Sequence, residues 1–367
     1  GFDPDEKLLT TTTLGRRDSR TPQKRATSNP HFRATANNVA DLNSDPNLPT
    51  KQVLRITRAT TATSIAAAAT ITAVILPALA PALYLAGAGS YITAAWIRLP
   101  QLDHKVRRPW IALLVGIGSL FASVLVRSIH GAITGQEAPF PSPADAGGYV
   151  GYLGIISCVW LFIRSHGHRH PRWRKEAAID GVIVAVAVAI VIFASILLPY
   201  ILDDTIDLGD RLTNMGYSVL TIVLVGHVAT LAVGSGVRNR SWRLLAIGSG
   251  LIIISDILLL LHTTGNPWAV RPAGGTAVAA FICGTAAIIH PDAARMSVTA
   301  SAKPPSFSAG RLLMIGVAIL IVPLALSISL ITGQDSSLLI IMVGALVLGG
   351  LTLYRIWLLF AANERVA

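Results

Sequence analysis

Residues 178–200 read AIDGVIVAVAVAIVIFASILLPY, and Asp180 is the only charged side chain in this run. About 20 helical residues are needed to cross the roughly 30 Å hydrocarbon core of a bilayer. The apolar residues are continuous, whereas a strand of a membrane β-barrel would alternate apolar and polar positions. The run therefore predicts a transmembrane helix.

The same pattern recurs along the chain. From residue 61 onward, long apolar stretches alternate with short polar breaks. We expect an all-α polytopic membrane protein with about ten transmembrane helices in a bundle over residues 61–360. The first two stretches, separated only around Pro77 and Pro81, could instead form one long helix and an interfacial piece. The predicted spans are 61–79, 82–98, 110–130, 147–164, 178–200, 213–234, 244–262, 273–290, 312–331 and 338–360.

The composition agrees with a membrane protein. Hydrophobic residues make up 52% of the 367 residues and charged residues only 13%, whereas soluble domains carry about 25% charged residues. The net charge of +11 would favour nucleic-acid binding in a soluble protein. Here the basic residues lie in a tail and in short loops, so we expect the lipid bilayer, and no nucleic acid, as partner. Cys158 and Cys283 lie in apolar runs and are expected to be buried thiols rather than a disulfide.

Residues 1–60 differ from the rest of the chain. They are rich in Thr, Ser, Asn, Pro, Arg and Lys and show no apolar periodicity. This composition predicts a disordered, basic, cytoplasmic tail. Its basic side chains could rest on anionic lipid head groups, although a solvated tail whose last charges fix the topology is the simpler interpretation.

Basic residues between the spans predict the orientation. With a cytoplasmic N-terminus, the even-numbered connections carry 15 Lys and Arg residues, and the odd-numbered ones carry two, Arg211 and Arg271. Cytoplasmic loops are enriched in Lys and Arg. We therefore expect an even number of spans, both termini in the cytoplasm, and location in the plasma membrane. The acidic segment LDDTIDLGDR (202–211) then falls on the outer face.

The segment HGHRH (166–170) is the strongest candidate for a metal site, because alternating histidines can bind a metal. Five basic residues lie within it or beside it and would repel a divalent cation, so we expect no metal there. We interpret the segment as a basic loop against the inner leaflet, with Trp173 as an interfacial anchor. Arg355 and Trp357, near the end of the last span, are expected to be anchors of the same kind.

Ionisable residues inside the predicted spans are costly in lipid and therefore mark a candidate polar site. We expect Arg127 to pair with Asp256, because the two lie at a similar depth. The pair would either line a cavity open to the outer side, where a ligand or proton is sensed, or fix the packing of helices. Asp180 is expected to be structural. The candidate site residues are Arg127, His130, Tyr217, His227, Asp256 and His262.

Motifs of catalysis are not found in the sequence. It contains no phosphate loop, dinucleotide-binding glycine motif, zinc signature or serine nucleophile elbow. The connections between spans are also too short for a catalytic domain. We expect no catalytic residue and no cofactor in this chain, and the question of whether the whole protein is an enzyme stays open.

Five segments resemble, in order, the N-terminal membrane region of actinobacterial GGDEF/EAL signalling proteins, the diguanylate cyclases and phosphodiesterases of cyclic di-GMP. The resemblance covers about residues 107–367 and implies a membrane-embedded input module, a signalling helix and a catalytic output domain. Because such cyclases work as dimers, it also implies a homodimer through the last helix. The segments are RRPWIALLVGIGSL (107–120), PFPSPADAGGYVGYLGI (139–155), EAAIDGVIVAVAVAI (176–190), RLLAIGSGLIIISDILLL (243–260) and AAIIHPDAARM (286–296).

Residues 361–367 are expected to begin the cytoplasmic signalling helix, since Leu359, Ala362 and Val366 have heptad spacing. The leading hypothesis is a sensory or anchoring module that relays a signal to a C-terminal output domain absent from this chain. A small ligand of unknown identity could also bind. The alternatives are the membrane region of a sensor histidine kinase and a self-contained, transporter-like membrane protein.

Overall fold

The described part of the chain is helical. The computed structural model describes residues 79–136, 138–167, 171–234, 239–263, 265–296, 309–332 and 338–363, and none of these residues forms a β-strand. The α-helices are α3 (Ala80–Arg98), α4 (His104–Thr134), α5 (Pro143–Gly167), α6 (Pro171–Ile192), α7 (Leu198–Leu202), α8 (Leu208–Gly234), α9 (Arg240–Thr263), α10 (Val270–Ile289), α11 (Ala309–Thr332) and α12 (Leu338–Asn363). Shorter helical pieces are Leu99–Gln101, Pro267–Ala269 and Pro291–Arg295, and a π-helical turn, Phe193–Leu197, joins α6 to α7.

These helices agree with the predicted spans and with a helical membrane protein. Within the described ranges, seven stretches are long and apolar enough to cross a membrane, and α11 adds the shorter apolar stretch Ile315–Ser327. Predicted spans two to ten each coincide with a described helix. The span 178–200 coincides with α6 and α7 together. The span 61–79, apart from its last residue, the tail 1–60 and residues 364–367 lie outside the described residues. The count of ten spans and the orientation stay predictions.

Local sequence signals set the ends of several helices. Pro81 lies in the first turn of α3, where its missing N–H leaves no hydrogen bond unmade. α4 ends at Gly135, whose φ of +67° is left-handed and whose N–H donates to the carbonyl of Gly131. At the start of α5, the Asp145 carboxylate accepts a hydrogen bond from the backbone N–H of Ser142 at 2.7 Å, as in a capping box.

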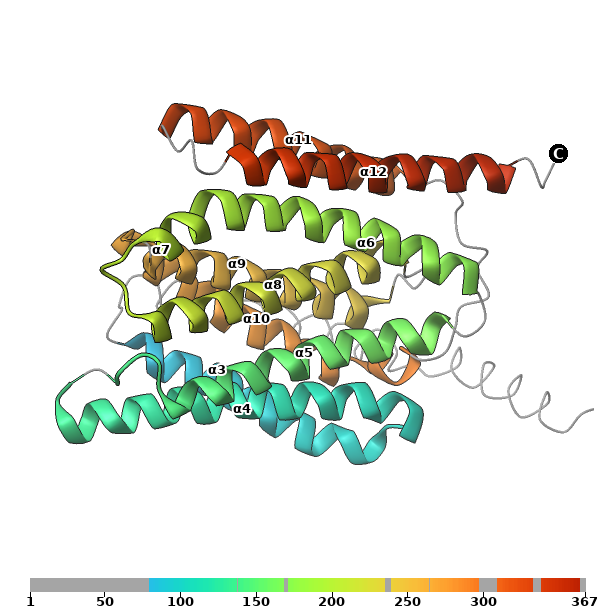
Figure 1. Cartoon of the computed structure of the whole chain (residues 1–367). Coiled ribbons are helices and arrows are strands. Elements are labelled where there is room, and N and C mark those ends of the chain that lie inside the picture. Colours follow the sequence, from blue (N-terminus) through green and yellow to red (C-terminus); the bar gives the residue numbers. More distant parts are fainter. Residues whose placement is uncertain are drawn as a thin grey trace, which may run out of the picture. The chain divides into compact units, whose positions relative to one another are not determined.

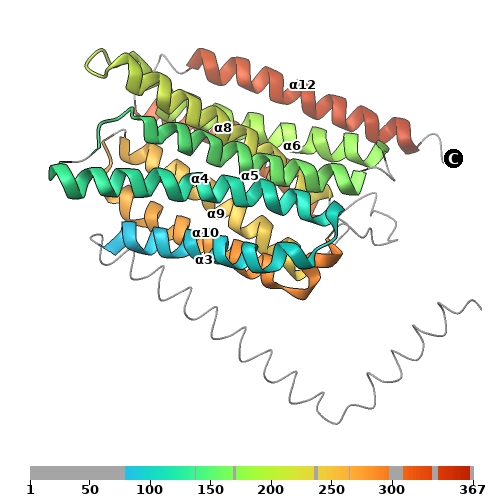
Figure 2. The same ribbon diagram turned by 90° about the horizontal axis from the view of Figure 1, so that it is seen from below.

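Six helices close into a ring in which each helix packs against two neighbours. The order is α3, α4, α5, α8, α9 and α10, and α10 packs against α3 again. α6 packs on the outside of α8, and both α11 and α12 pack on α6. Figure 1 shows α11 and α12 lying along α6, on the opposite side of the bundle from α3 and α4. In the view of Figure 2, α3 and α12 again lie on opposite sides.

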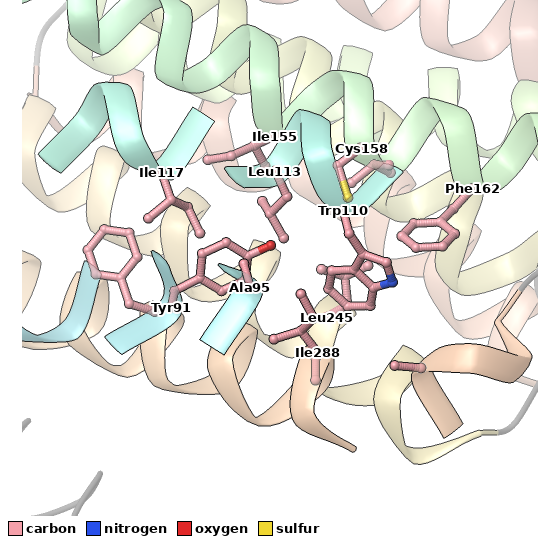
Figure 3. Close-up of a cluster of buried hydrophobic side chains, with 14 of the residues drawn as sticks. Tyr91, Ala95, Trp110, Leu113, Ile117, Ile155, Cys158, Phe162, Leu245 and Ile288 are labelled. Atoms are coloured by element: carbon pink, nitrogen blue, oxygen red, sulfur yellow. The ribbon is translucent and has the colours of Figure 1, made fainter. Parts of the chain in front are cut away.

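Large aromatic and aliphatic side chains fill one half of this ring, which we call the packed end; it is the end at which α4 begins. Trp110 is fully buried, and Phe162 meets both Trp110 and Trp242 edge-on, with ring centroids 5.5 and 5.9 Å apart. Figure 3 shows Trp110 beside Phe162 and Cys158, with Tyr91 reaching in from α3. Cys158 is a buried free thiol, as predicted.

α4 and α5 approach each other backbone to backbone. A Cβ on Gly154 would lie 2.5 Å from the Cα of Gly116, and a Cβ on Gly116 would lie 2.7 Å from the carbonyl oxygen of Gly151. Backbone atoms cannot move aside as a flexible side chain can, so only glycine fits these positions. Small residues at helix contacts allow such close approach in membrane proteins.

We predict that Gly154→Ala destabilises the protein by about 1–3 kcal/mol, because the new methyl group forces α4 and α5 apart. Gly118 on α4 is the matched control, since nothing lies within 4 Å of a Cβ placed there. Gly118→Ala is expected to change stability by less than about 1 kcal/mol. Thermal unfolding of the purified variants in detergent compares them, and equal melting temperatures would contradict the close contact.

Candidate functional site

The other half of the ring is hollow. A cavity of about 440 Å³ is lined by residues of all six ring helices, from Tyr84 on α3 to Ala277 on α10. We call it the ring cavity. It lies at the end where α4 finishes and α5 begins, which the loop charges predict to be the outer end. Phe140 and Leu259 line it and are 38% and 50% exposed, so the cavity reaches the surface of the bundle there.

An ion pair, formed by Arg127 and Asp145, lines this cavity. Nη2 of Arg127 on α4 lies 2.6 Å from Oδ1 of Asp145 on α5, and the side chain of Asp145 is only 8% exposed. The hydroxyl of Tyr217 on α8 donates to the same Asp145 oxygen at 3.2 Å. The predicted pairing of Arg127 with Asp256 is therefore wrong: α5 lies beside α4 in the ring and supplies the carboxylate, whereas α9 does not.

A stack of tyrosine rings connects this pair to the interior of the cavity. Tyr149 and Tyr217 stack with centroids 4.7 Å apart, and Tyr152 meets Tyr217 edge-on at 5.7 Å. Gly148 and Gly216 make room for the stack, since a methyl group on either one would overlap the hydroxyl of Tyr217 or Tyr149, respectively. In the α5–α8 contact, each helix thus packs a tyrosine ring against a glycine of the other helix.

Asp256 on α9 lines the same cavity with a different set of neighbours. Its carboxylate accepts a hydrogen bond from the hydroxyl of Thr221 on α8, at 3.2 Å, and Tyr152 on α5 lines the same cavity. Within the described ranges, no Lys, Arg or His forms an ion pair with it. Among the described residues, Asp256 is therefore held in place by a neutral donor.

Three of the six predicted site residues line the ring cavity, namely Arg127, Tyr217 and Asp256. The three histidines do not. His227, also on α8, lines a different groove together with Trp160 and Arg164. His130 and His262 are absent from the cavity lining, and Nδ1 of His262 is buried without a hydrogen bond. These three histidines therefore lie on other sides of their helices than the ring cavity.

Sequence reasoning missed Asp145, Tyr152 and Thr221 as site residues. Asp145 carried a readable signal: the order Ser-Pro-Ala-Asp at 142–145 matches a helix start in which the acid reaches back to the first N–H. That signal placed the residue at a helix end but did not reveal its pairing with Arg127. Tyr152 and Thr221 are uncharged, and nothing in the hydropathy separates them from other span residues.

An acidic loop lies next to the cavity rim. A Cβ on Gly209 would lie 3.2 Å from Cγ of Pro141, so the first turn of α8, which follows the acidic loop, rests against the segment that carries Phe140. In this loop the hydroxyl and the backbone N–H of Thr205 donate to Asp203 at 2.6 and 3.0 Å. These two hydrogen bonds lower the pKa of the exposed Asp203 carboxyl, which keeps it ionised near neutral pH.

A second ion pair joins α12 to α6. Arg355, predicted to be an interfacial anchor, is only 3% exposed, and that prediction is wrong. Its Nε donates to Oδ1 of the fully buried Asp180 at 2.6 Å, and its Nη2 lies 3.4 Å from Glu176. The guanidinium cannot snorkel to an interface, because α6 supplies carboxylates at its own depth. The prediction that Asp180 is structural agrees with this contact.

The remaining predicted features are only partly described. Trp357 is 60% exposed and stacks with Tyr354 at 5.9 Å, and its anchor role stays a prediction. The side chain of Trp173 lies outside the described residues, as do His168, His170 and the side chain of His166. The HGHRH segment is therefore not tested by the structure.

A double-mutant cycle tests the pairing of Arg127. Combining Arg127→Gln with Asp145→Asn should give a coupling free energy of about 1–2 kcal/mol, because the two side chains share an ion pair that is only partly solvated. The cycle cancels the separate loss of the Asp145 cap. The matched cycle of Arg127→Gln with Asp256→Asn should give less than about 0.5 kcal/mol. The reverse ranking would restore the Arg127–Asp256 pair.

The α6–α12 pair predicts a characteristic pattern of stabilities. Arg355→Met alone should cost about 3–5 kcal/mol, because it removes the guanidinium that pairs with the buried Asp180. The double variant Arg355→Met/Asp180→Leu should recover most of that loss, since apolar groups replace both charges. Chemical or thermal unfolding in detergent measures the difference. A double variant no more stable than the single one would argue against a buried pair.

Comparison with protein-family models, with curated proteins and with solved structures yields no match for this chain. The role of the ring cavity must therefore be inferred from its own residues.

Proposed function

We propose that the chain is the membrane-embedded sensory module of a cyclic di-GMP signalling protein. A small ligand in the ring cavity would bias the packing of α12, which leads toward a cytoplasmic output domain. The resemblance of residues 107–367 to the membrane region of GGDEF/EAL proteins supports this assignment. The whole protein would then be a diguanylate cyclase, a cyclic di-GMP phosphodiesterase or both.

The observation that most supports a sensory function is the contrast between the two halves of the ring. At the packed end, aromatic and aliphatic side chains such as Trp110 and Phe162 fill the space between the helices. At the other end, Arg127, Asp145 and Asp256 are held at a cavity of about 440 Å³. Ionisable groups inside a membrane are expensive and mark functional sites by default. A site closed at one end suits reception of a ligand better than its passage.

A contiguous route leads from the cavity to α12. Tyr217 and Thr221 on α8 line the cavity. Further along α8, Gly181 of α6 packs so closely that a methyl group there would overlap the Thr230 hydroxyl. α12 is then tied to α6 by the ion pair of Arg355. A shift of α8 by a ligand would therefore be transmitted through α6 to α12, as in other helix-shift switches.

The two alternatives make different demands on the same features. A sensor histidine kinase would use the same route to a different output domain. A transporter would need the packed end to open, and the π-helical turn Phe193–Leu197 is a feature that could support such a change in α6. Neither alternative requires that cyclic di-GMP respond to changes in the cavity.

Cellular cyclic di-GMP provides the test. We predict that expression of the full coding sequence changes the level of this nucleotide in a bacterial strain without its own cyclases and phosphodiesterases. To detect phosphodiesterase activity, a cyclase is co-expressed to supply the nucleotide. Asp256→Asn, which keeps the shape of the cavity, should alter that output at least about threefold, because it changes the charge that a ligand meets. Mass spectrometry of cell extracts measures the nucleotide.

Asp103→Asn is the matched control for this experiment. Asp103 loses the same charge but is exposed before α4, at the end of the ring away from the cavity, so its output should equal that of the unchanged protein. A protein that leaves cyclic di-GMP unaltered would refute the signalling assignment. An autophosphorylated histidine in the expressed protein would instead establish the kinase alternative.

A further inference from the structure

The structure points to an organic cation as the ligand of the ring cavity: we propose that the cavity binds a small organic ammonium ion, with Asp256 as its counter-ion. This inference rests on the proposed function only for its biological meaning. The binding itself follows from the charges, the rings and the size of the cavity, and it can be measured without any output domain.

Among the charged groups that line the cavity, one carboxylate has no counter-charge in the described part of the chain. Arg127 and Asp145 neutralise each other at 2.6 Å. Asp256 receives a hydrogen bond from the Thr221 hydroxyl, and no cation of the described chain pairs with it. A neutral donor holds a carboxylate in position without supplying the positive charge that would balance it. A monovalent cation would.

The walls of the cavity suit an organic cation better than a metal ion. Aromatic residues Tyr84, Phe140, Tyr152 and Tyr217 line it together with Asp256. Aromatic faces attract ammonium groups through their negative electrostatic potential, and such contacts strengthen when they are shielded from water. A divalent metal would require several oxygen, nitrogen or sulfur ligands. In the part of the chain that the structure describes, no group of three acidic, His or Cys residues offers them.

The size of the cavity sets the scale of the ligand. About 440 Å³ lies within the range of roughly 300–1,000 Å³ that is usual for small-molecule sites. This volume is more than one hydrated ion needs and accommodates an ammonium group with an aromatic or aliphatic substituent. The substituent would lie against the apolar part of the lining, such as Leu120, Ile252 and Leu260.

The surroundings of the rim favour a positive ligand as well. The first turn of α8 rests against Pro141 through Gly209, beside the exposed lining residue Phe140. The α7–α8 loop just before it carries Asp203, Asp204 and Asp207, and Arg211 lies 3.7 Å from Asp204 and also acts on Asp203. Clustered charges of one sign raise the local concentration of oppositely charged ligands and speed their association.

Benzyltrimethylammonium is a suitable probe, and neopentylbenzene is its neutral counterpart of the same shape. Because the quaternary nitrogen carries no proton, its binding cannot be mistaken for protonation of a carboxylate. Isothermal titration calorimetry of the purified chain in lipid nanodiscs should show saturable binding of the cation. Competition by neopentylbenzene should be at least about tenfold weaker, because the neutral molecule gains nothing from the carboxylate.

Two variants with opposite expected effects make the test independent of folding. Asp256→Asn should weaken binding of the cation by about tenfold or more, because it removes the counter-ion. Arg127→Gln should strengthen binding severalfold, because Asp145 then adds a second unbalanced negative charge, and a gain in affinity cannot arise from a misfolded protein. Asp103→Asn, at an exposed position before α4 and so at the packed end, should leave the affinity within about twofold of the original.

Three outcomes would overturn the proposal: equal affinity for the cation and for neopentylbenzene, unchanged affinity in a folded Asp256→Asn variant, or weaker binding by Arg127→Gln. If Asp256→Asn does not fold, the result for Arg127→Gln decides. The two proposals can also fail separately. Cation binding with no effect on cyclic di-GMP would refute the signalling function alone, whereas Asp256-dependent signalling without cation binding would refute this inference alone.

Discussion

Every ionisable side chain inside this bundle has to find its partner within the bundle, because lipid offers neither water nor counter-ions. Three such centres show three solutions. Arg127 is balanced by Asp145, which also begins α5. Arg355 is balanced by Asp180, which ties α12 to α6. Asp256 accepts a hydrogen bond from the Thr221 hydroxyl and forms no ion pair among the described residues. In our proposal, this difference separates the groups that maintain the fold from the one that receives a ligand.

The positions of the helices could be predicted from the sequence because the bilayer imposes an absolute length. A run such as 178–200 is long and apolar enough to be recognised without knowledge of its neighbours. The described helices accordingly begin and end near the predicted spans, and most helix ends extend beyond them, by about two turns at the start of α6. Capping residues and prolines lie in those extensions, where hydropathy carries no information.

Pairings between helices could not be predicted, because hydropathy gives the depth of a residue but not the order of the helices. Arg127 and Asp256 lie at similar depths, yet the ring places α5 rather than α9 beside α4. From the sequence, Arg355 resembles an interfacial anchor. Its pairing with Asp180 becomes evident only when α6 is known to lie next to α12. Candidate residues selected by charge alone also omitted Tyr152 and Thr221, whose importance comes only from the carboxylate that they face.

The contrast between the packed and the hollow ends of the ring has a consequence for how the protein fluctuates. Backbone amides near Trp110 and Phe162 are covered by tightly interlocked side chains, so opening them requires the larger part of the unfolding free energy. Amides near the ring cavity lack that cover and should exchange their hydrogens through smaller, local openings. The packed end of the ring thus stays rigid while the cavity end undergoes local opening motions. The helices α8 and α9 extend through both ends.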